Sequence, residues 1–258
     1  MRITLLQTDI VWENKQANLH RLHPQLESLA GTTDLVLLPE TFSTGFSMES
    51  NRLAEPNDGH TLTALRQMAA RYQFALAGSH IATDRDAASC YNRAFFITPE
   101  GDEWFYDKRH LFRMGRETES FTAGTRRTVI TYRGWHILLL VCYDLRFPVW
   151  SRNVCLEYDL LLYTANWPAS RRAVWDTLLP ARALENMSYV CGVNRVGTDG
   201  EGLLHDGGSV AYSFKGEPLA SIPDNEEAHA TIELDLNALQ TFRRKFPAWK
   251  EADNFTLH

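Results

Sequence analysis

Residues 138–148 of the chain read LLLVCYDLRFP, an apolar run that reaches a cysteine and then becomes abruptly polar. Such a run is typical of a strand buried on both faces in a parallel sheet. The change to polar residues indicates that the following element turns away from the sheet. Because a strand end supports a side chain rigidly, Cys142 is the first candidate for a catalytic nucleophile.

Two further segments have the same arrangement. The apolar run Leu35–Leu38 leads to Glu40, and the short run Trp104–Tyr106 leads to Lys108. A neutral thiol needs a base to take its proton and a cation to stabilise the developing oxyanion, and these two residues can supply both. Each residue alone has an ordinary reading as a solvated strand end, a surface charge or a buried small hydrophobe. Their occurrence together, in the order Glu, Lys, Cys, favours catalysis.

At these residues the sequence resembles the nitrilase superfamily of carbon–nitrogen hydrolases, whose catalytic residues follow the same order. The resemblance runs through most of the chain in separate blocks. These blocks are Leu38-Pro39-Glu40, Asn92-Arg93-Ala94, Pro99-Glu100-Gly101, Lys108-Arg109-His110-Leu111-Phe112, Phe121-Thr122-Ala123-Gly124, Val141-Cys142-Tyr143-Asp144 and Arg182-Ala183-Leu184-Glu185-Asn186.

The family also has a second glutamate near the site, seven positions before a glycine. That spacing matches Glu117 before Gly124, with Glu119 as a nearby competitor. The resemblance implies that Glu117 orients the lysine and the substrate amide and helps to move a proton to the departing ammonia. The alternative is one exposed acid in the charged loop 113–120.

The mechanism implied by the resemblance is hydrolysis of an amide through a cysteine thioester. Glu40 removes the thiol proton, Cys142 attacks the amide carbonyl, and Lys108 and the backbone N–H of Tyr143 stabilise the oxyanion. Glu40 then acts as an acid toward the leaving nitrogen and as a base toward the water that hydrolyses the thioester.

Expected substrate contacts come from the same resemblance. Asn166 and Trp167, in the loop after the run 160–163, lie where the family builds one wall of its pocket, and Phe42 and Tyr143 are expected on the other walls. Several blocks are similar to the bacterial omega-amidase branch, whose members hydrolyse the terminal amide of 2-oxo dicarboxylic monoamides such as 2-oxoglutaramate and 2-oxosuccinamate. These blocks are residues 108–114, 142–153, 165–168 and the tail 245–249.

A small anionic substrate requires a cationic or amide-rich end of the pocket. The available arginines are Arg113, Arg116, Arg171, Arg172 and Arg195, and the sequence does not select among them. Within the superfamily the alternatives are an amidase of deaminated glutathione, an N-carbamoyl amine hydrolase and a true nitrilase. Outside it, the alternatives are a catalytically silent binding protein on the same fold and a redox sensor at Cys142, for which Cys155 would be a poor resolving partner.

The sequence gives no reason to expect a metal or a cofactor. The four cysteines form no C-x-x-C pair, and no glycine-rich phosphate-binding motif is present. A cysteine protease would need an imidazole partner, and His110 is the nearest candidate by sequence. Because the family uses lysine in this block, His110 is expected to be a pocket-wall or packing residue.

Composition favours one cytoplasmic enzyme domain over residues 1–258. The 258 residues are 44% hydrophobic, the formal net charge is −6, and the basic residues are scattered, which argues against a nucleic-acid surface. No apolar run reaches the ~18 residues of a membrane span, and the amino terminus lacks the apolar core of a signal peptide. Four cysteines without an evident pairing suit a reducing compartment.

Short apolar runs alternate with helical periods, which is typical of a layered α/β protein. Strands are expected at residues 3–6, 35–38, 74–78, 95–98, 137–141, 160–163, 189–193, 209–214 and 230–234. Helices are expected around residues 19–29, 62–72, 173–187 and 236–245, with Pro180 kinking the third. The resemblance implies an α-β-β-α sandwich that forms a homodimer, an α-β-β-α-α-β-β-α assembly.

Overall fold

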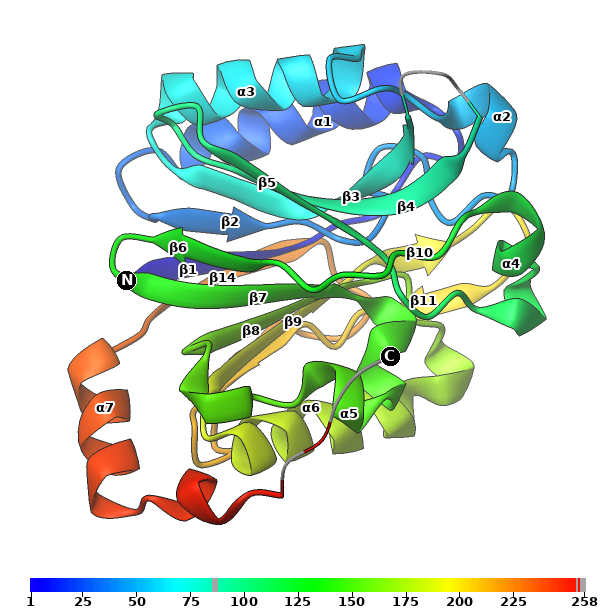
Figure 1. Ribbon diagram of the computed structural model, residues 1–258. Helices are drawn as coiled ribbons and strands as arrows, with labels where there is room; N and C mark the ends of the chain where they lie inside the picture. Colours follow the sequence, from blue (N-terminus) through cyan, green and yellow to red (C-terminus); the bar gives the residue numbers. More distant parts are fainter. Residues whose placement is uncertain (85–87, 254, 256–258) are drawn as a thin grey trace.

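Two six-stranded sheets pack face to face in the computed structural model, which describes residues 1–84, 88–253 and 255 (Figure 1). The first sheet has the order β14-β1-β2-β3-β4-β5 and the second the order β13-β12-β9-β8-β7-β6. The first comprises β1 (Arg2–Gln7), β2 (Leu35–Leu37), β3 (Ala75–Thr83), β4 (Cys90–Ile97), β5 (Glu103–Asp107) and β14 (Ala228–Glu233). The second comprises β6 (Val129–Tyr132), β7 (Trp135–Val141), β8 (Leu160–Ala165), β9 (Tyr189–Asn194), β12 (Val210–Tyr212) and β13 (Pro218–Ser221). A small hairpin, β10 (Val196–Thr198) and β11 (Leu204–Asp206), follows β9.

The centre of each sheet is parallel and its edges are antiparallel. In the first sheet β1, β2 and β3 run parallel, and in the second β7, β8 and β9 do. Strand β4 is antiparallel to both β3 and β5, so β5 runs in the same direction as β3 and β2 and ends on the same side of the sheet. The ends of β2, β5, β7 and β8 therefore deliver the residues that follow them to one edge of the sandwich.

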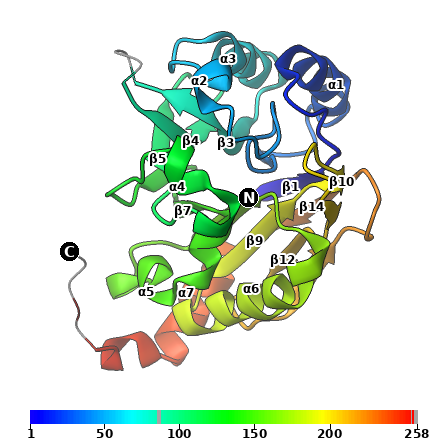
Figure 2. The same cartoon turned by 90° about the vertical axis from the view of Figure 1, so that its right-hand side faces the viewer.

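Helices cover the outer face of each sheet (Figures 1 and 2). Over the first sheet lie α1 (Lys15–Ser28) and α3 (His60–Tyr72), and over the second lies α6 (Arg172–Asn186), with the short α5 (Pro148–Ser151) beside it. The remaining helices are α2 (Ser50–Leu53), α4 (Glu117–Ser120) and α7 (Leu236–Lys245), and single 3-10 turns are η1 (Arg113–Gly115), η2 (Cys142–Arg146), η3 (Val154–Leu156), η4 (Ala169–Arg171) and η5 (Ala248–Glu251).

Alternation of side chains along the strands separates two cores. On β1, Ile3 and Leu5 point into the core between the sheets, and Leu6 points into the core beneath α1 and α3. Leu19 and Leu65 are buried in that second core. The period of two along strands and of about 3.6 along helices thus produces the four layers.

Local signals explain where two of the helices begin. The side chain of Asn14 accepts a hydrogen bond from the Ala17 N–H at the start of α1, and Asp235 accepts one from Ala238 at the start of α7. Such caps satisfy donors that the first helical turn leaves unpaired.

The expected α-β-β-α sandwich is confirmed, and all the expected strands and helices are present, the helix at 236–245 with the expected bounds and the others with shifted ends. The largest shifts are in β3 and β4, which extend beyond the expected residues 74–78 and 95–98 because they pair over eight positions. Pro180 lies inside α6, which continues through it. None of the helices in the described part of the chain combines the length and apolar character needed to cross a membrane.

Candidate active site

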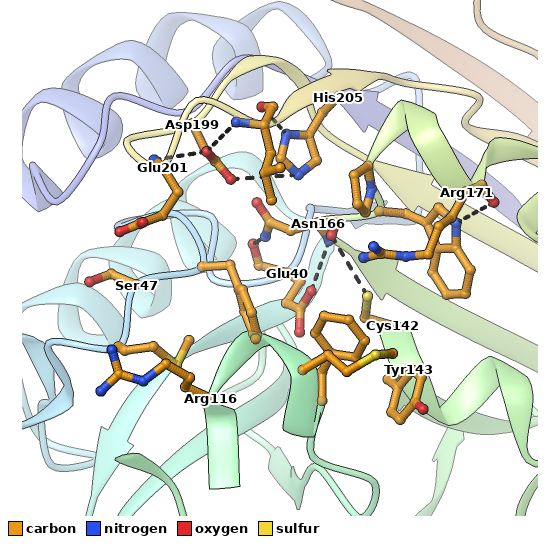
Figure 3. Close-up of a pocket in the computed structure, with 18 of the residues that line it drawn as sticks. Glu40, Ser47, Arg116, Cys142, Tyr143, Asn166, Arg171, Asp199, Glu201 and His205 are labelled. Carbon is orange, nitrogen blue, oxygen red and sulfur yellow. Dashed lines mark hydrogen bonds and ion pairs between the residues drawn. The ribbon is translucent and has the colours of Figure 1, made fainter. Parts of the chain in front are cut away.

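A pocket of about 490 Å³ lies where the ends of β2, β5, β7 and β8 meet. Glu40, Lys108 and Cys142 all line it, although they come from three separate strand ends. Figure 3 shows Glu40 and Cys142 in the pocket. The two sheets are joined at this edge because the Thr164 hydroxyl donates to the Leu38 carbonyl at 2.7 Å. This placement agrees with the sequence-based expectation that the three residues act together.

Lys108 holds two buried carboxylates together. Its Nζ lies 2.8 Å from Glu40 Oε1 and 3.0 Å from both carboxylate oxygens of Glu117. Asn92 bridges the same two acids, since its Nδ2 donates to Glu40 Oε1 at 2.7 Å and to Glu117 Oε1 at 3.1 Å. Lys108 is 1% exposed and both glutamates are 0% exposed, so almost none of this group is in contact with bulk solvent.

The protonation of this group follows from its charges. Burial alone would lower the pKa of the Lys108 ammonium, but Glu117 and Glu40 outweigh it and raise that pKa, so the lysine remains charged. Burial raises the pKa of the Glu117 carboxyl, while Lys108 acts in the opposite direction. Because the two carboxylates share one ammonium, the group carries one negative charge in excess, and a carboxylate can accept a proton.

Cys142 has a strained backbone at the end of β7. Its φ is +43°, a conformation that residues other than glycine seldom adopt, and it begins the short turn η2. Its Sγ lies 3.9 Å from the Asn166 carbonyl oxygen. Burial raises the pKa of the thiol well above its ordinary value and the Glu40 carboxylate adds to this effect, while Lys108 opposes it. The thiol is therefore neutral at neutral pH and requires a base for attack.

A buried carboxylate connects this strained turn to the lysine loop. Asp144 accepts hydrogen bonds from Val141 N, His110 N, His110 Nδ1 and the Tyr106 hydroxyl, at 2.8–3.1 Å. The His110 ring stacks on Phe147 with centroids 3.7 Å apart. His110 is thus a packing residue that supports Asp144, in agreement with the expectation that it would not serve as an imidazole partner.

The structure places the two candidate second glutamates differently. Glu117 is fully buried, and its carboxylate accepts from Lys108 and from the Phe112 N–H. Glu119 is exposed and pairs with Arg116. Only Glu117 reaches the buried group, as the spacing to Gly124 predicted. The Gly124 position is tight because a Cβ there would lie 1.9 Å from the Asp107 carbonyl oxygen.

Three of the four expected substrate contacts line the pocket, namely Tyr143, Asn166 and Trp167. Asn166 also donates its N–H to Glu40 Oε2 at 2.8 Å, and its buried Oδ1 has no hydrogen-bond partner among the described residues. The expectation for Phe42 is wrong. Its ring packs edge-on against Phe95 in the core beneath α1 and α3, away from this pocket.

Of the five candidate arginines, Arg171 and Arg116 line the pocket. Arg172 forms ion pairs with acids outside it, Arg195 is buried against Asp9, and Arg113 lies outside the lining. A sixth arginine, Arg146, also lines the pocket although the sequence did not single it out as a candidate. Its position four residues after Cys142, within the same short turn, was the available signal.

Asn92 is the other functional residue that was not selected from the sequence as a site residue. The signal was a polar residue that interrupts a strand otherwise rich in apolar residues, and its side chain is 1% exposed. Within residues 1–84, 88–253 and 255, no group of three His, Cys, Asp or Glu side chains is arranged to hold a metal ion.

The family model of the carbon-nitrogen hydrolases matches residues 2–244. The chain is 45% identical to the omega-amidase YafV of Escherichia coli K12, over 100% of this chain and 98% of that protein. It is 34% identical to the 2-oxoglutaramate amidase of Paenarthrobacter nicotinovorans, over 86% of this chain and 79% of that protein.

A solved structure is similar over the whole chain. It is that of a CN-hydrolase superfamily protein from Xanthomonas campestris with an arsenic adduct in its active site, and it has 42% identity and a TM-score of 0.96. The alignment covers 100% of this chain and 99% of that one. Family match, relatives and fold agree, and the chain belongs to the carbon–nitrogen hydrolases of the nitrilase superfamily.

Proposed function

We propose that the protein is an omega-amidase that hydrolyses the terminal amide of 2-oxo dicarboxylic monoamides, such as 2-oxoglutaramate and 2-oxosuccinamate, to the 2-oxo acid and ammonia. The observation that carries the proposal is the buried group of Glu40, Lys108 and Glu117 beside Cys142, at one end of a pocket of about 490 Å³. Support for the substrate class comes from the omega-amidase and 2-oxoglutaramate amidase relatives.

In the first half of the reaction, Glu40 takes the proton of Cys142 as the sulfur attacks the amide carbonyl. The transfer is concerted with attack because the raised pKa of the thiol disfavours a free thiolate. The oxyanion is stabilised by the Lys108 ammonium and by the backbone N–H of Tyr143, the second residue of the turn η2, which fixes its position. Glu40 then donates the proton to the leaving nitrogen, and ammonia departs from a thioester on Cys142.

In the second half, Glu40 acts as a base toward the water that hydrolyses the thioester. Its Oε2 accepts from the Asn166 N–H and its Oε1 from Asn92 and Lys108, so the carboxylate keeps one orientation in both halves. Glu117 keeps Lys108 directed at the reacting carbonyl and balances its charge while the proton moves. These roles require no metal ion or cofactor.

Tyr143, Asn166 and Trp167 are proposed to contact the substrate. Asn166 lines the pocket, its buried Oδ1 is an acceptor without a partner among the described residues, and the two N–H groups of a primary amide are donors of the matching kind. Leaving such an acceptor unpaired typically costs about 1–3 kcal/mol, which a bound amide would recover.

We further propose that the protein acts as a homodimer in the cytoplasm. Val149 on α5, Val154 on η3 and Leu184 on α6 are 53%, 40% and 55% exposed on the outer helical layer of the second sheet. Arg152 donates to the Glu185 carbonyl and connects these segments, and a second copy that covered this layer would bury their exposed apolar side chains. All four cysteines lie among the described residues and are free, which suits a reducing compartment.

The test is the rate of ammonia release from a panel of amides at equal concentrations. The panel contains 2-oxoglutaramate, 2-oxosuccinamate, glutamine, deaminated glutathione, an N-carbamoyl amine and an aliphatic nitrile; for deaminated glutathione the released cysteinylglycine is measured instead. The proposal predicts a kcat/KM for 2-oxoglutaramate that is at least about 10²-fold above that for glutamine. Preference for any of the last three compounds would overturn the substrate assignment and leave the family unchanged.

A further inference from the structure

Two arginine side chains in the pocket have no acidic partner among the described residues. They are Arg146 and Arg171, both half-buried and both part of the pocket lining. The other pocket cations are engaged, because Lys108 pairs with Glu40 and Glu117, and Arg116 pairs with Glu119 in solvent. The pocket therefore has two guanidinium groups available for an anionic ligand.

Aromatic rings hold both guanidinium groups without neutralising them. The Cζ of Arg171 lies 4.8 Å from the centre of the Phe112 ring, and that of Arg146 lies 5.5 Å from the Trp167 ring. A guanidinium that stacks on a ring keeps its N–H edges free for bidentate hydrogen bonds. These contacts orient the groups as donors to a carboxylate or a carbonyl oxygen.

Both arginines line the same pocket as Cys142, and the charge of Arg146 acts on Arg171. Burial lowers the pKa of the Arg171 guanidinium; the Cys142 sulfur acts in the opposite direction, and Arg146 lowers it further. In Figure 3 Arg171 lies on the same side of the pocket as Cys142 and Tyr143, and Asp199 and Glu201 lie on the other side. An anion bound between the arginines would offset their mutual repulsion, and the acids would repel it from the opposite end.

We propose that Arg171 and Arg146 form the subsite for the 2-oxo acid end of the substrate, in which Arg171 binds the carboxylate and Arg146 donates to the adjacent keto oxygen. This inference rests on the proposed omega-amidase function and names the residues that select its substrates. Arg146, as the last residue of η2, has a position fixed relative to Cys142 at the start of the same turn.

The subsite explains how a 2-oxo acid is distinguished from the corresponding amino acid. The carbon next to the carboxylate carries a keto oxygen in 2-oxoglutaramate and an ammonium group in glutamine. The oxygen accepts a hydrogen bond from Arg146, whereas the ammonium is repelled by it and has no acceptor there. Two like charges in a partly buried site cost enough to disfavour glutamine by orders of magnitude.

The experiment measures kcat/KM of the wild type, Arg171→Gln and Arg146→Gln on four amides. These are 2-oxoglutaramate, glutamine, 4-carbamoylbutanoate, which lacks both groups at the second carbon, and neutral butanamide. Arg171→Gln should lose about 10²-fold on the three carboxylates, mainly through KM, and less than about threefold on butanamide. Arg146→Gln should reduce the ratio of 2-oxoglutaramate to glutamine by at least about tenfold. Arg113→Gln, an exposed arginine outside the pocket lining, is the control and should change none of these ratios.

Equal losses on butanamide and on the carboxylates would overturn the subsite. A misfolded variant is recognised by its thermal unfolding, and Arg171→Lys then serves instead, since it keeps the charge but loses the bidentate fork; a KM increase confined to the carboxylates supports the proposal.

Failure of the proposed function has a separate signature. The wild type would then show no preference for 2-oxoglutaramate over 4-carbamoylbutanoate, which refutes the keto-oxygen role of Arg146. The decrease in kcat/KM that Arg171→Gln causes on 4-carbamoylbutanoate, compared with that on butanamide, would still decide whether Arg171 binds a carboxylate.

Discussion

The chemistry of this site depends on a single cation shared by two buried carboxylates. Lys108 contacts both Glu40 and Glu117, so a change at either acid alters the charge and the position of the other. The neutral thiol of Cys142 adds no charge to the group before reaction. The arrangement places a buried carboxylate that can accept a proton beside the Cys142 thiol.

Glu117→Gln should lower kcat by about 10²-fold with little change in KM, because Lys108 loses one of its two counter-charges and is no longer held toward the carbonyl. Steady-state kinetics on 2-oxoglutaramate measure the effect. The control is Glu119→Gln, two residues away, exposed and paired with Arg116, which should keep wild-type kinetics. Similar losses in both variants would mean that the charge of the loop, and not the buried contact, matters.

The wrong expectation for Phe42 has a local cause. Thr41, just after Glu40, has a φ of +42°, which turns the chain so that the next side chain enters the core beneath α1 and α3. A backbone reversal at a threonine has no reliable sequence signal, whereas the types of Glu40, Lys108 and Cys142 are visible in the sequence. Sequence thus indicates which chemistry is present more readily than it indicates where side chains point.

At the scale of elements, the site is assembled from strand ends. Glu40, Lys108 and Cys142 each follow an apolar strand, and these strands were predictable because short apolar runs bounded by polar residues are typical of buried strands. Glu117 and Arg171 lie instead on short turns, α4 and η4, whose orientation depends on contacts distant in sequence. For that reason Glu117 was suggested only by the family's spacing before a glycine, and the sequence could not select one of the five arginines as the substrate-binding residue.

Asp144 supports the position of Cys142, because its hydrogen bonds connect β7 and η2 to β5 and the loop that follows it. Asp144→Asn keeps the shape but replaces one acceptor oxygen by a donor that faces other donors. We expect a loss of about 3 kcal/mol in stability and about 10²-fold in kcat, because Cys142 shifts relative to Lys108.

The control for that change is Asp34→Asn, at the start of β2. Asp34 likewise accepts from several donors, Arg2 and Arg133 among them, at residues that do not line the pocket. It should lose stability without losing kcat. Chemical denaturation and steady-state kinetics of both variants separate the two effects, and an unchanged kcat in Asp144→Asn would contradict the supporting role.

At the scale of the whole molecule, His80 makes the stability depend on pH. It is 1% exposed in β3, and its Nε2 has no partner among the described residues. Burial lowers its pKa from 6.5 to about 3 in the folded state. The unfolded chain therefore binds a proton below pH 6.5 that the folded protein does not, so stability is full above pH 6.5 and falls as pH decreases toward 3.

Replacement of His80 removes that contribution. Between pH 7 and pH 5, the free energy of unfolding of His80→Gln should fall by about 2 kcal/mol less than that of the wild type. Urea unfolding at the two pH values measures this difference, with His20→Gln, an exposed histidine, as control. Parallel curves for wild type and His80→Gln would show that His80 is protonated in the folded protein.

The oligomeric state is difficult to infer from one copy of the chain, because an interface is visible there only as exposed apolar side chains. Leu184→Glu should convert the proposed dimer into a monomer, since it places a charge in the apolar area formed with Val149 and Val154. Light scattering after size exclusion gives the mass. Leu219→Glu on β13, a leucine of similar exposure, should leave the mass unchanged. A monomeric wild type would refute the dimer.

Cys142 is proposed to carry the reaction, and ammonia release from 2-oxoglutaramate by the wild type and by Cys142→Ala tests this role. The two proteins should have the same circular dichroism and similar thermal unfolding, because the side chain contributes chemistry more than packing. The kcat of the variant should be at least about 10⁴-fold lower. A folded Cys142→Ala protein that keeps most of its turnover would contradict this role.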